Sequence, residues 1–254
     1  MTATTPIRRL TIHIAYGLAL FVTTTGAALA NTAATTPFIG HFKVSRSGLG
    51  LGTAKFHLRP GDKPGCYVYT GRADPNALAK MFIGRITEKS RFCMRDGQIR
   101  PQYFKHHIDG AKDDSFTLNF DWSKHVVRYE NEQGQTRTMR FDDQVLDPLS
   151  LQIAARRWLM NAQDPSELGT RTFTLVDENK IKPYQLKVTP APDISVPAGT
   201  FQVLKLKRTN DNHPLTFWLS KKHDWIPVRV HKSAGSSSYQ MDINKLIVDG
   251  ANAG

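Results

Sequence analysis

The stretch VLDPLSLQIAARRWLM, residues 145–160, is the one long segment with helical periodicity in this sequence, and the fold depends on what it packs against. Asp147 is a good helix-capping residue because its carboxylate can accept hydrogen bonds from the first backbone amides. Pro148 suits the first turn, where no backbone donor is needed. These residues predict a helix over residues 147–161.

This helix has a wide apolar stripe. The residues that recur at helical spacing on one side are Leu151, Ala154, Ala155, Trp158 and Leu159. Arg156 and Arg157 fall between these positions, and we expect both to point outward. A stripe of this width must be buried, so the helix needs an apolar partner surface elsewhere in the chain.

The rest of the sequence is dominated by segments that alternate apolar and polar residues with a period of two, which is typical of strands with one buried face. The clearest examples are residues 115–120, 184–188, 225–231 and 239–243. Weaker candidates are residues 38–44, 53–58, 66–71, 85–94, 101–107, 125–130, 136–141, 171–176, 201–208 and 214–220. Turn-forming pairs such as Asp96-Gly97 separate them, which predicts antiparallel hairpins.

So many strands with one apolar face cannot remain a flat sheet in water. We therefore predict a mainly β fold, in which a curved antiparallel sheet forms a barrel or half-barrel. The helix over residues 147–161 is expected to cover the concave side of this sheet, and a second, short helical turn is expected at residues 76–81.

The N-terminus has the pattern of a secretory signal peptide. Arg8-Arg9 precedes an apolar run at residues 10–22, and Ala28-Leu29-Ala30 matches a signal peptidase site. The run is too short for a membrane span, which argues against an uncleaved anchor. We predict a signal peptide over residues 1–30, a single β-rich domain over residues 31–254, and a periplasmic location.

Cys66 and Cys93 are the two cysteines of the chain, and both lie in expected strands. In an oxidising compartment a disulfide between them is favoured. The alternative is two separate thiols that are buried as small hydrophobic side chains.

The chain is basic, with 34 Lys and Arg against 22 Asp and Glu, a formal charge of +12. This excess favours an anionic partner, such as phospholipid headgroups, lipopolysaccharide phosphates or acidic glycans, whereas nucleic acid is not expected in the periplasm. Simple solubility is the alternative. The basic residues that cluster in sequence are Lys205, Lys207, Arg208, Lys221, Lys222 and His223.

Several spaced motifs cover nearly all of the chain that follows the signal peptide. They are PFIGHFKV, GLGTAKFHL, ALAKMFIGRITEKSRF, DGQIRPQYF, FDWSKHVVRY, DPLSLQIAARRWL, VPAGTFQVLKLKR and FWLSKKHDWIPVRV. Taken together and in this order, they resemble the bacterial domain-of-unknown-function 3108 family. The resemblance implies an exported, β-rich envelope protein, and it transfers no catalytic residue.

Candidate site residues are few. Trp122, Trp158, Trp218 and Arg156 are candidate ligand contacts, with core packing as the alternative for the tryptophans. Asp121 is a weak candidate for a catalytic carboxylate, because Trp122 beside it can stack on a sugar. No metal site or cofactor is expected, since the histidines lack the His-x-His and His-x-x-x-His spacings of ligand sets.

These observations favour a non-enzymatic periplasmic protein of the binding or envelope-maintenance type. Its expected partner is a lipid or another amphipathic or anionic envelope component, with peripheral membrane contact. Two alternatives stay open: an enzyme that acts on polysaccharides, either a glycoside hydrolase or a lyase, and a structural docking protein for an outer-membrane partner. The sequence does not determine the oligomeric state.

Overall fold

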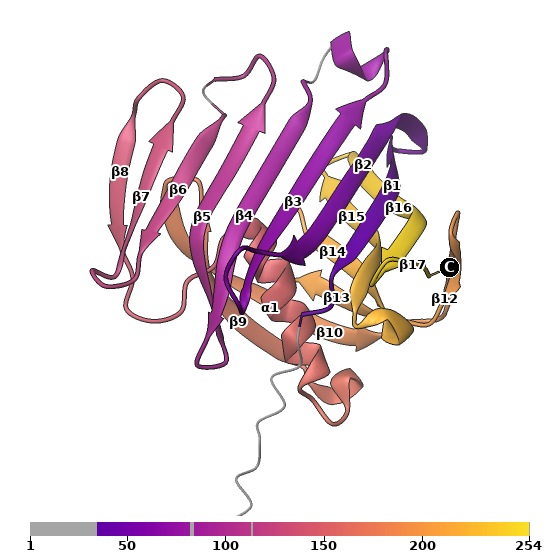
Figure 1. Ribbon diagram of the computed structural model, residues 1–254. Coiled ribbons are helices and arrows are strands. Elements are labelled where there is room, and N and C mark those ends of the chain that lie inside the picture. The colour runs from indigo at the N-terminus through magenta and orange to yellow at the C-terminus, as the bar shows by residue number, and fades with distance from the viewer. Residues whose placement is uncertain (1–34, 82–83, 113, 254) are drawn as a thin grey trace, which may run out of the picture. The chain divides into compact units, whose positions relative to one another are not determined.

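The computed structural model describes residues 35–81, 84–112 and 114–253. They form one large antiparallel sheet, a separate two-stranded hairpin and one α-helix (Figure 1). The signal peptide predicted over residues 1–30 lies outside the described residues. Within the described part of the chain, no helix is long and apolar enough to cross a membrane.

The first arm of the sheet is a meander of eight strands that follow one another along the chain. Each strand pairs with the next, from β1 to β8. The strands are β1 Phe38–Arg46, β2 Leu49–Pro60, β3 Cys66–Pro75, β4 Ile86–Arg95, β5 Gln98–Ile108, β6 Phe116–Asp121, β7 Val126–Asn131 and β8 Thr136–Arg140.

The second arm begins where β1 pairs with β16, and it continues in the order β16-β15-β14-β13-β10-β9. Its strands are β9 Thr170–Asp177, β10 Lys180–Pro190, β13 Val203–Arg208, β14 Leu215–Ser220, β15 Ile226–Ala234 and β16 Ser237–Val248. Shorter elements are the hairpin β11 Ile194–Val196 and β12 Gly199–Phe201, the edge piece β17 Ala251–Asn252, and the 3₁₀ turns η1 Ala79–Met81, η2 Pro165–Glu167 and η3 Lys221–His223.

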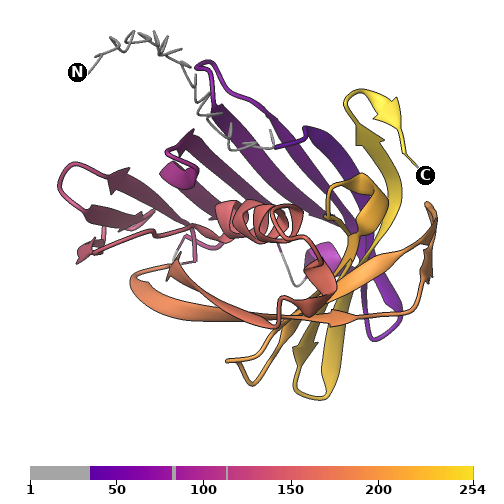
Figure 2. The ribbon, with the colours of Figure 1, turned by 90° about the horizontal axis from the view of Figure 1, so that it is seen from below.

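The sheet is curved but not closed. Its two outer strands, β8 and β9, do not pair with each other in the described structure. Register shifts between His41 and Phe42 and between Arg91 and Phe92 mark bulges, which increase the bend of a sheet. Figure 2 shows the two arms on either side of the helix. The predicted curved antiparallel sheet with one covering helix is confirmed.

The alternation of apolar and polar residues that predicted the strands also determines which side chains of each strand face the interior. In β4, Ser90 and Phe92 are fully buried and face the interior, whereas Lys89 and Arg91 are exposed on the outer face. Every strand segment expected from the sequence is present. The hairpin strands β11 and β12 and the edge piece β17 were not predicted, because elements of two or three residues are too short for an alternating pattern.

The helix α1, Pro148–Met160, begins as its sequence predicts. The Asp147 carboxylate accepts hydrogen bonds from the backbone amides of Leu149 and Ser150, at 2.9 Å each. The Ser150 hydroxyl in turn accepts from the Asp147 amide, which completes a reciprocal cap. The short helical turn expected at residues 76–81 is present as η1.

The expectation that Arg156 and Arg157 point outward is wrong, because both side chains are buried. The reason is that α1 contacts β3, β4 and β5 of the first arm and β9 of the second arm, so little of its surface faces solvent. The Arg156 Nε donates to the Asp224 carbonyl at 2.9 Å, and its guanidinium lies 5.2 Å from the centre of the Phe38 ring. The helix therefore packs on the concave side of the sheet, between its two arms, and is covered by both of them.

Cys66 and Cys93 form a disulfide and face each other in register across β3 and β4, as one of the two sequence alternatives expected. The bond closes a loop of 27 residues. Changing both to serine is expected to lower the free energy of unfolding by about 3 kcal/mol, since the unfolded chain regains the entropy of that loop. Urea denaturation of the variant measures this. If the wild type unfolds at the same midpoint with and without a reductant, the expectation is wrong.

Candidate binding cavity

A cavity of about 510 Å³ lies between the two arms of the sheet, beside the N-terminal half of α1. Leu151, Gln152 and Ala155 contribute the wall on the helix side. Leu159, farther along the helix, does not line the cavity and is fully buried. The helix thus fills one end of the interior and leaves the other end unfilled.

The inner walls of the cavity are mainly apolar and come from both arms. The first arm contributes Phe104 and Phe116, and the second arm contributes Leu175, Leu186, Leu206, Phe217 and Leu219. They reach the cavity because every second residue of a strand faces the same side. A cavity of this size and composition falls within the range of small-molecule and lipid-chain sites, about 300–1,000 Å³.

Charged side chains gather at the mouth of the cavity, where β4 and β10 begin and β5, β9 and β13 end. The cavity residues of this kind are the carboxylates Glu88, Asp114, Asp177, Glu178 and Asp211, the cations Arg208 and Lys232, and the histidines His106 and His213. The mouth is thus more acidic than the chain as a whole, although the chain is basic.

His106 and Glu88 form the polar group on the first-arm side of the mouth. The His106 Nδ1 lies 2.9 Å from the Glu88 carboxylate, and its ring stacks on Phe116. Burial alone would lower the pKa of His106, but the bond to Glu88 and the nearby carboxylates of Glu178 and Asp114 raise it above the ordinary value. Because Glu178 belongs to the turn between β9 and β10, the two arms approach each other here.

Arg208 and Tyr184 form the corresponding group on the second-arm side. The Arg208 guanidinium lies 4.2 Å from the centre of the Tyr184 ring and forms an ion pair with Asp211. Burial raises the pKa of Tyr184 to about 12, so its hydroxyl stays protonated at neutral pH. The cation of Arg208 is therefore balanced by a carboxylate within the protein.

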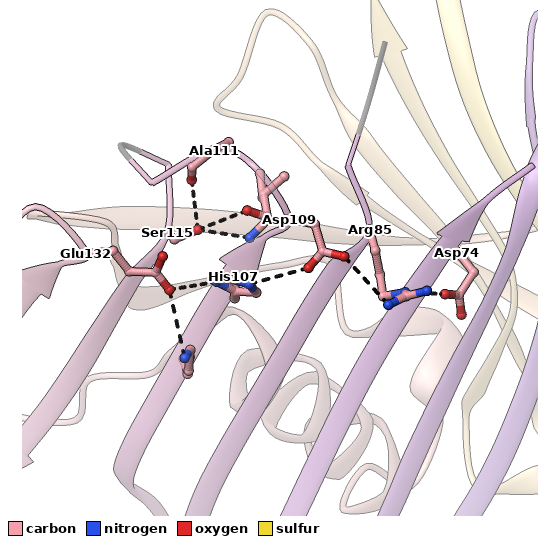
Figure 3. Close-up of polar contacts among 9 residues, drawn as sticks. Asp74, Arg85, His107, Asp109, Ala111, Ser115 and Glu132 are labelled. Atoms are coloured by element: carbon pink, nitrogen blue, oxygen red, sulfur yellow. Dashed lines mark hydrogen bonds and ion pairs between the residues drawn. The ribbon is translucent and has the colours of Figure 1, made fainter. Parts of the chain in front are cut away.

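A chain of polar contacts joins the strand ends of the first arm at this same end of the sheet (Figure 3). His107 lies 2.6 Å from Glu132 and 3.4 Å from Asp109. Arg85 connects Asp109, at 3.6 Å, with Asp74, at 2.6 Å. Each exposed pair contributes little alone, but together the contacts link the ends of β3, β5 and β7 with the residue before β4.

Asp147 is a buried carboxylate that serves the helix rather than the cavity. Besides the two amides of its cap, it accepts a hydrogen bond of 2.7 Å from the Ser90 hydroxyl of β4. Burial raises the pKa of Asp147 to about 6, against the opposing effect of these hydrogen bonds. The side chain is not among those that line the cavity. It fixes the start of α1 to the first arm.

None of the four predicted ligand contacts lines the cavity. The Trp122 indole donates to the Pro101 carbonyl at 2.6 Å, and Trp158 packs edge-on against Phe173. Trp218 is half-buried and pairs in register with Lys205 and Arg229. Arg156 belongs to α1, and its Nε donates a hydrogen bond to the Asp224 carbonyl. The structure does not bring these four residues together, and their role in ligand binding stays a prediction.

Asp121 stabilises the turn between β6 and β7. Its carboxylate accepts hydrogen bonds from the Ser123 hydroxyl and from the amides of Ser123 and Lys124. The Ser123 hydroxyl, followed by the Lys124 amide, lowers the pKa of Asp121 to about 2. A general acid of a glycosidase needs a raised pKa, so this environment gives no support to that role.

Of the residues in the two basic clusters of the sequence, Arg208 alone lines the cavity, at its mouth. Lys205 and Lys207 line a separate hollow of about 360 Å³ beside Lys187, while Lys221 and Lys222 belong to η3.

The sequence patterns did not identify His106, Glu88 and Glu178 as mouth residues, because these residues come from strands and turns that are far apart in the chain. The alternation in β10 placed Tyr184 and Leu186 on one face and was the available signal.

Comparisons with known proteins name no activity for this chain. A search of curated proteins finds no match. Among solved structures, the beta-barrel-like protein of domain of unknown function DUF1849 from Brucella abortus is similar, with a TM-score of 0.49 and 10% identity over 84% of this chain and 98% of that chain. The model of the DUF3108 family, described as protein of unknown function, matches residues 41–244. Because this match spans most of the sequence, the chain belongs to the DUF3108 family.

Proposed function

We propose that this protein is a periplasmic, non-enzymatic binding protein that holds a lipid or another amphipathic envelope component in the cavity beside α1. The observation that carries the proposal is the cavity of about 510 Å³, which has apolar inner walls and charged groups at one end. An acyl chain would lie among Phe104, Leu186 and Leu206, and the polar head would stay at the mouth. Water fills an apolar space poorly, so a ligand that displaces it gains free energy.

The location is part of this proposal. The signal-peptide pattern of residues 1–30 supports export, and the Cys66–Cys93 disulfide suits an oxidising compartment. N-terminal sequencing of the protein recovered from a periplasmic fraction tests it. A mature chain that begins at Asn31 is expected, and recovery only from the cytoplasmic fraction would contradict the assignment.

Filling the cavity should weaken ligand binding without unfolding the protein. Ala155 lines the cavity from the helix side, so the larger ring of Ala155→Phe would occupy the space of a ligand. We expect at least tenfold weaker binding of a fluorescent fatty acid to the delipidated protein, measured by titration in the absence of membranes. Organic extraction and mass spectrometry of the purified wild type should also recover bound lipid.

The matched control is Asn119→Phe, which places the same side chain on the exposed outer face of β6. This variant should bind the probe like the wild type. The proposal fails if the wild type neither binds the probe nor yields lipid on extraction. It also fails if both phenylalanine variants bind the probe equally well.

A further inference from the structure

Large apolar side chains are exposed at two neighbouring turns of the first arm. Leu49, Leu78 and Met81 expose 61%, 56% and 75% of their surface. Single exposed hydrophobic residues are common on protein surfaces, but a group of them usually marks a contact. In the described structure, Tyr239 is the one other large apolar side chain that is exposed, at 37%.

These three side chains come from segments that the backbone holds side by side. Leu49 begins β2, whereas Leu78 and Met81 lie in the connection after β3. The Asn76 amide donates to the Leu51 carbonyl at 2.7 Å, and the Asn76 side chain donates to the Gly50 carbonyl at 2.8 Å. We call this group of Leu49, Leu78 and Met81 the apolar tip.

The apolar tip lies at the same end of the sheet as the mouth of the cavity. In an antiparallel sheet, the start of β2, the end of β3, the start of β4 and the end of β5 share one end (Figure 1). The tip is at the first two of these positions, and the mouth residues Glu88 and His106 are near the last two. A surface that receives the tip would therefore also face the mouth.

Cationic side chains accompany the tip. Arg46, at the end of β1, is exposed beside Tyr239, with its guanidinium 5.4 Å from the centre of that ring. Lys80 is exposed between Leu78 and Met81. Apolar residues flanked by cations suit the boundary between lipid headgroups and acyl chains, where both kinds of side chain find partners.

We propose that the apolar tip inserts into the surface of an anionic phospholipid bilayer and docks the mouth of the cavity on it. Leu49, Leu78 and Met81 enter the acyl boundary, while Arg46 and Lys80 contact headgroup phosphates. This docking goes beyond the proposed ligand binding and does not require an occupied cavity. It gives an amphipathic ligand a path between bilayer and cavity that avoids water.

The main rival surface is the outer face of the first arm. On β1 to β5 it carries nine cations against the single carboxylate Asp74: Lys43, Lys55, Arg59, Arg72, Lys89, Arg91, Arg95, Arg100 and Lys105. That face could hold a polyanion by charge alone. Such binding would weaken steeply with salt, whereas insertion of apolar side chains depends less on it. The tip is favoured because it alone combines both kinds of contact at the mouth.

The test is flotation of the full chain with vesicles of phosphatidylcholine and phosphatidylglycerol. The variant Leu49→Ser/Leu78→Ser/Met81→Ser is expected to bind these vesicles at least tenfold more weakly than the wild type. It should still bind a fluorescent fatty acid in solution like the wild type, so a failure of docking is distinguishable from a failure of the cavity proposal. The matched control, Lys55→Ser/Lys89→Ser, should retain most vesicle binding at 0.15 M salt.

A second measurement does not depend on the triple variant folding. In Leu78→Trp, the emission of the new tryptophan should shift to shorter wavelength when vesicles are added, relative to the wild type. The proposal is overturned if the wild type does not float with vesicles, or if the lysine variant loses binding and the tip variant keeps it. A wild type that forms dimers which the tip variant cannot form would identify the tip as a contact between two copies and would also overturn it.

Discussion

Replacing Asp147 with alanine should lower the free energy of unfolding by about 3 kcal/mol at pH 5, because several buried groups lose their partner together. The amides of Leu149 and Ser150 lose the acceptor that caps α1, and the Ser90 hydroxyl loses a bond of 2.7 Å. All of these groups lie in the interior, where water does not replace the lost bonds. Urea denaturation followed by circular dichroism measures the change.

Asp147→Asn is the matched control for this prediction. Asparagine keeps an oxygen that can accept from the two amides, and it is an equally good cap. We expect its free energy of unfolding at pH 5 to lie within about 1 kcal/mol of the wild type. If alanine and asparagine destabilise equally, the cap does not hold the helix in place.

The free energy of unfolding of the wild type, relative to Asp147→Asn, should depend on pH in a defined direction. Burial raises the pKa of Asp147 from 3.8 to about 6, so the folded state binds this proton more tightly than the unfolded state. That contribution to stability is present below the unfolded pKa and is lost as the pH rises through about 6. Relative to Asp147→Asn, the wild type should lose about 2–3 kcal/mol between pH 4 and pH 8. Parallel stability curves for the two proteins would contradict this. His106 titrates in both, so its effect cancels in the difference.

Leu159→Ala should lower the free energy of unfolding by about 4 kcal/mol, whereas Leu151→Ala should lower it by about 2 kcal/mol. Both residues are leucines of α1, but Leu159 is fully buried at the filled end of the interior and Leu151 borders the cavity. Truncating Leu159 leaves a new void among packed side chains. Truncating Leu151 enlarges a space that already exists, so fewer contacts are lost.

This comparison tests the unfilled end of the interior without a ligand. Urea unfolding of the two delipidated variants at one pH gives the two values. If both variants lose the same free energy of unfolding, the interior is packed to the same density at both ends of the helix. The proposed binding cavity would then have no room for a ligand. Addition of a fluorescent fatty acid should stabilise the wild type, since a ligand that binds the folded state shifts the unfolding equilibrium.

The strands were predictable because their information is local. An alternating segment such as 115–120 carries its own period, and Asp96-Gly97 adopts positive φ at both positions, as a tight hairpin turn requires. The helix start at Asp147 and the Cys66–Cys93 disulfide were predictable for similar reasons. Capping depends on neighbours in sequence, and two cysteines have one possible intramolecular pairing.

The sequence by itself thus determined where the strands and the main helix lie along the chain, and that a curved sheet must receive the helix. Only the tertiary structure decided that both arms enclose the helix, which buries Arg156 and Arg157, and that the helix leaves a cavity at one end. It also brought Glu88 and His106 together with Glu178 at the mouth. The physical reason is that the period of a segment shows how many apolar faces it has, but not which distant segments cover them.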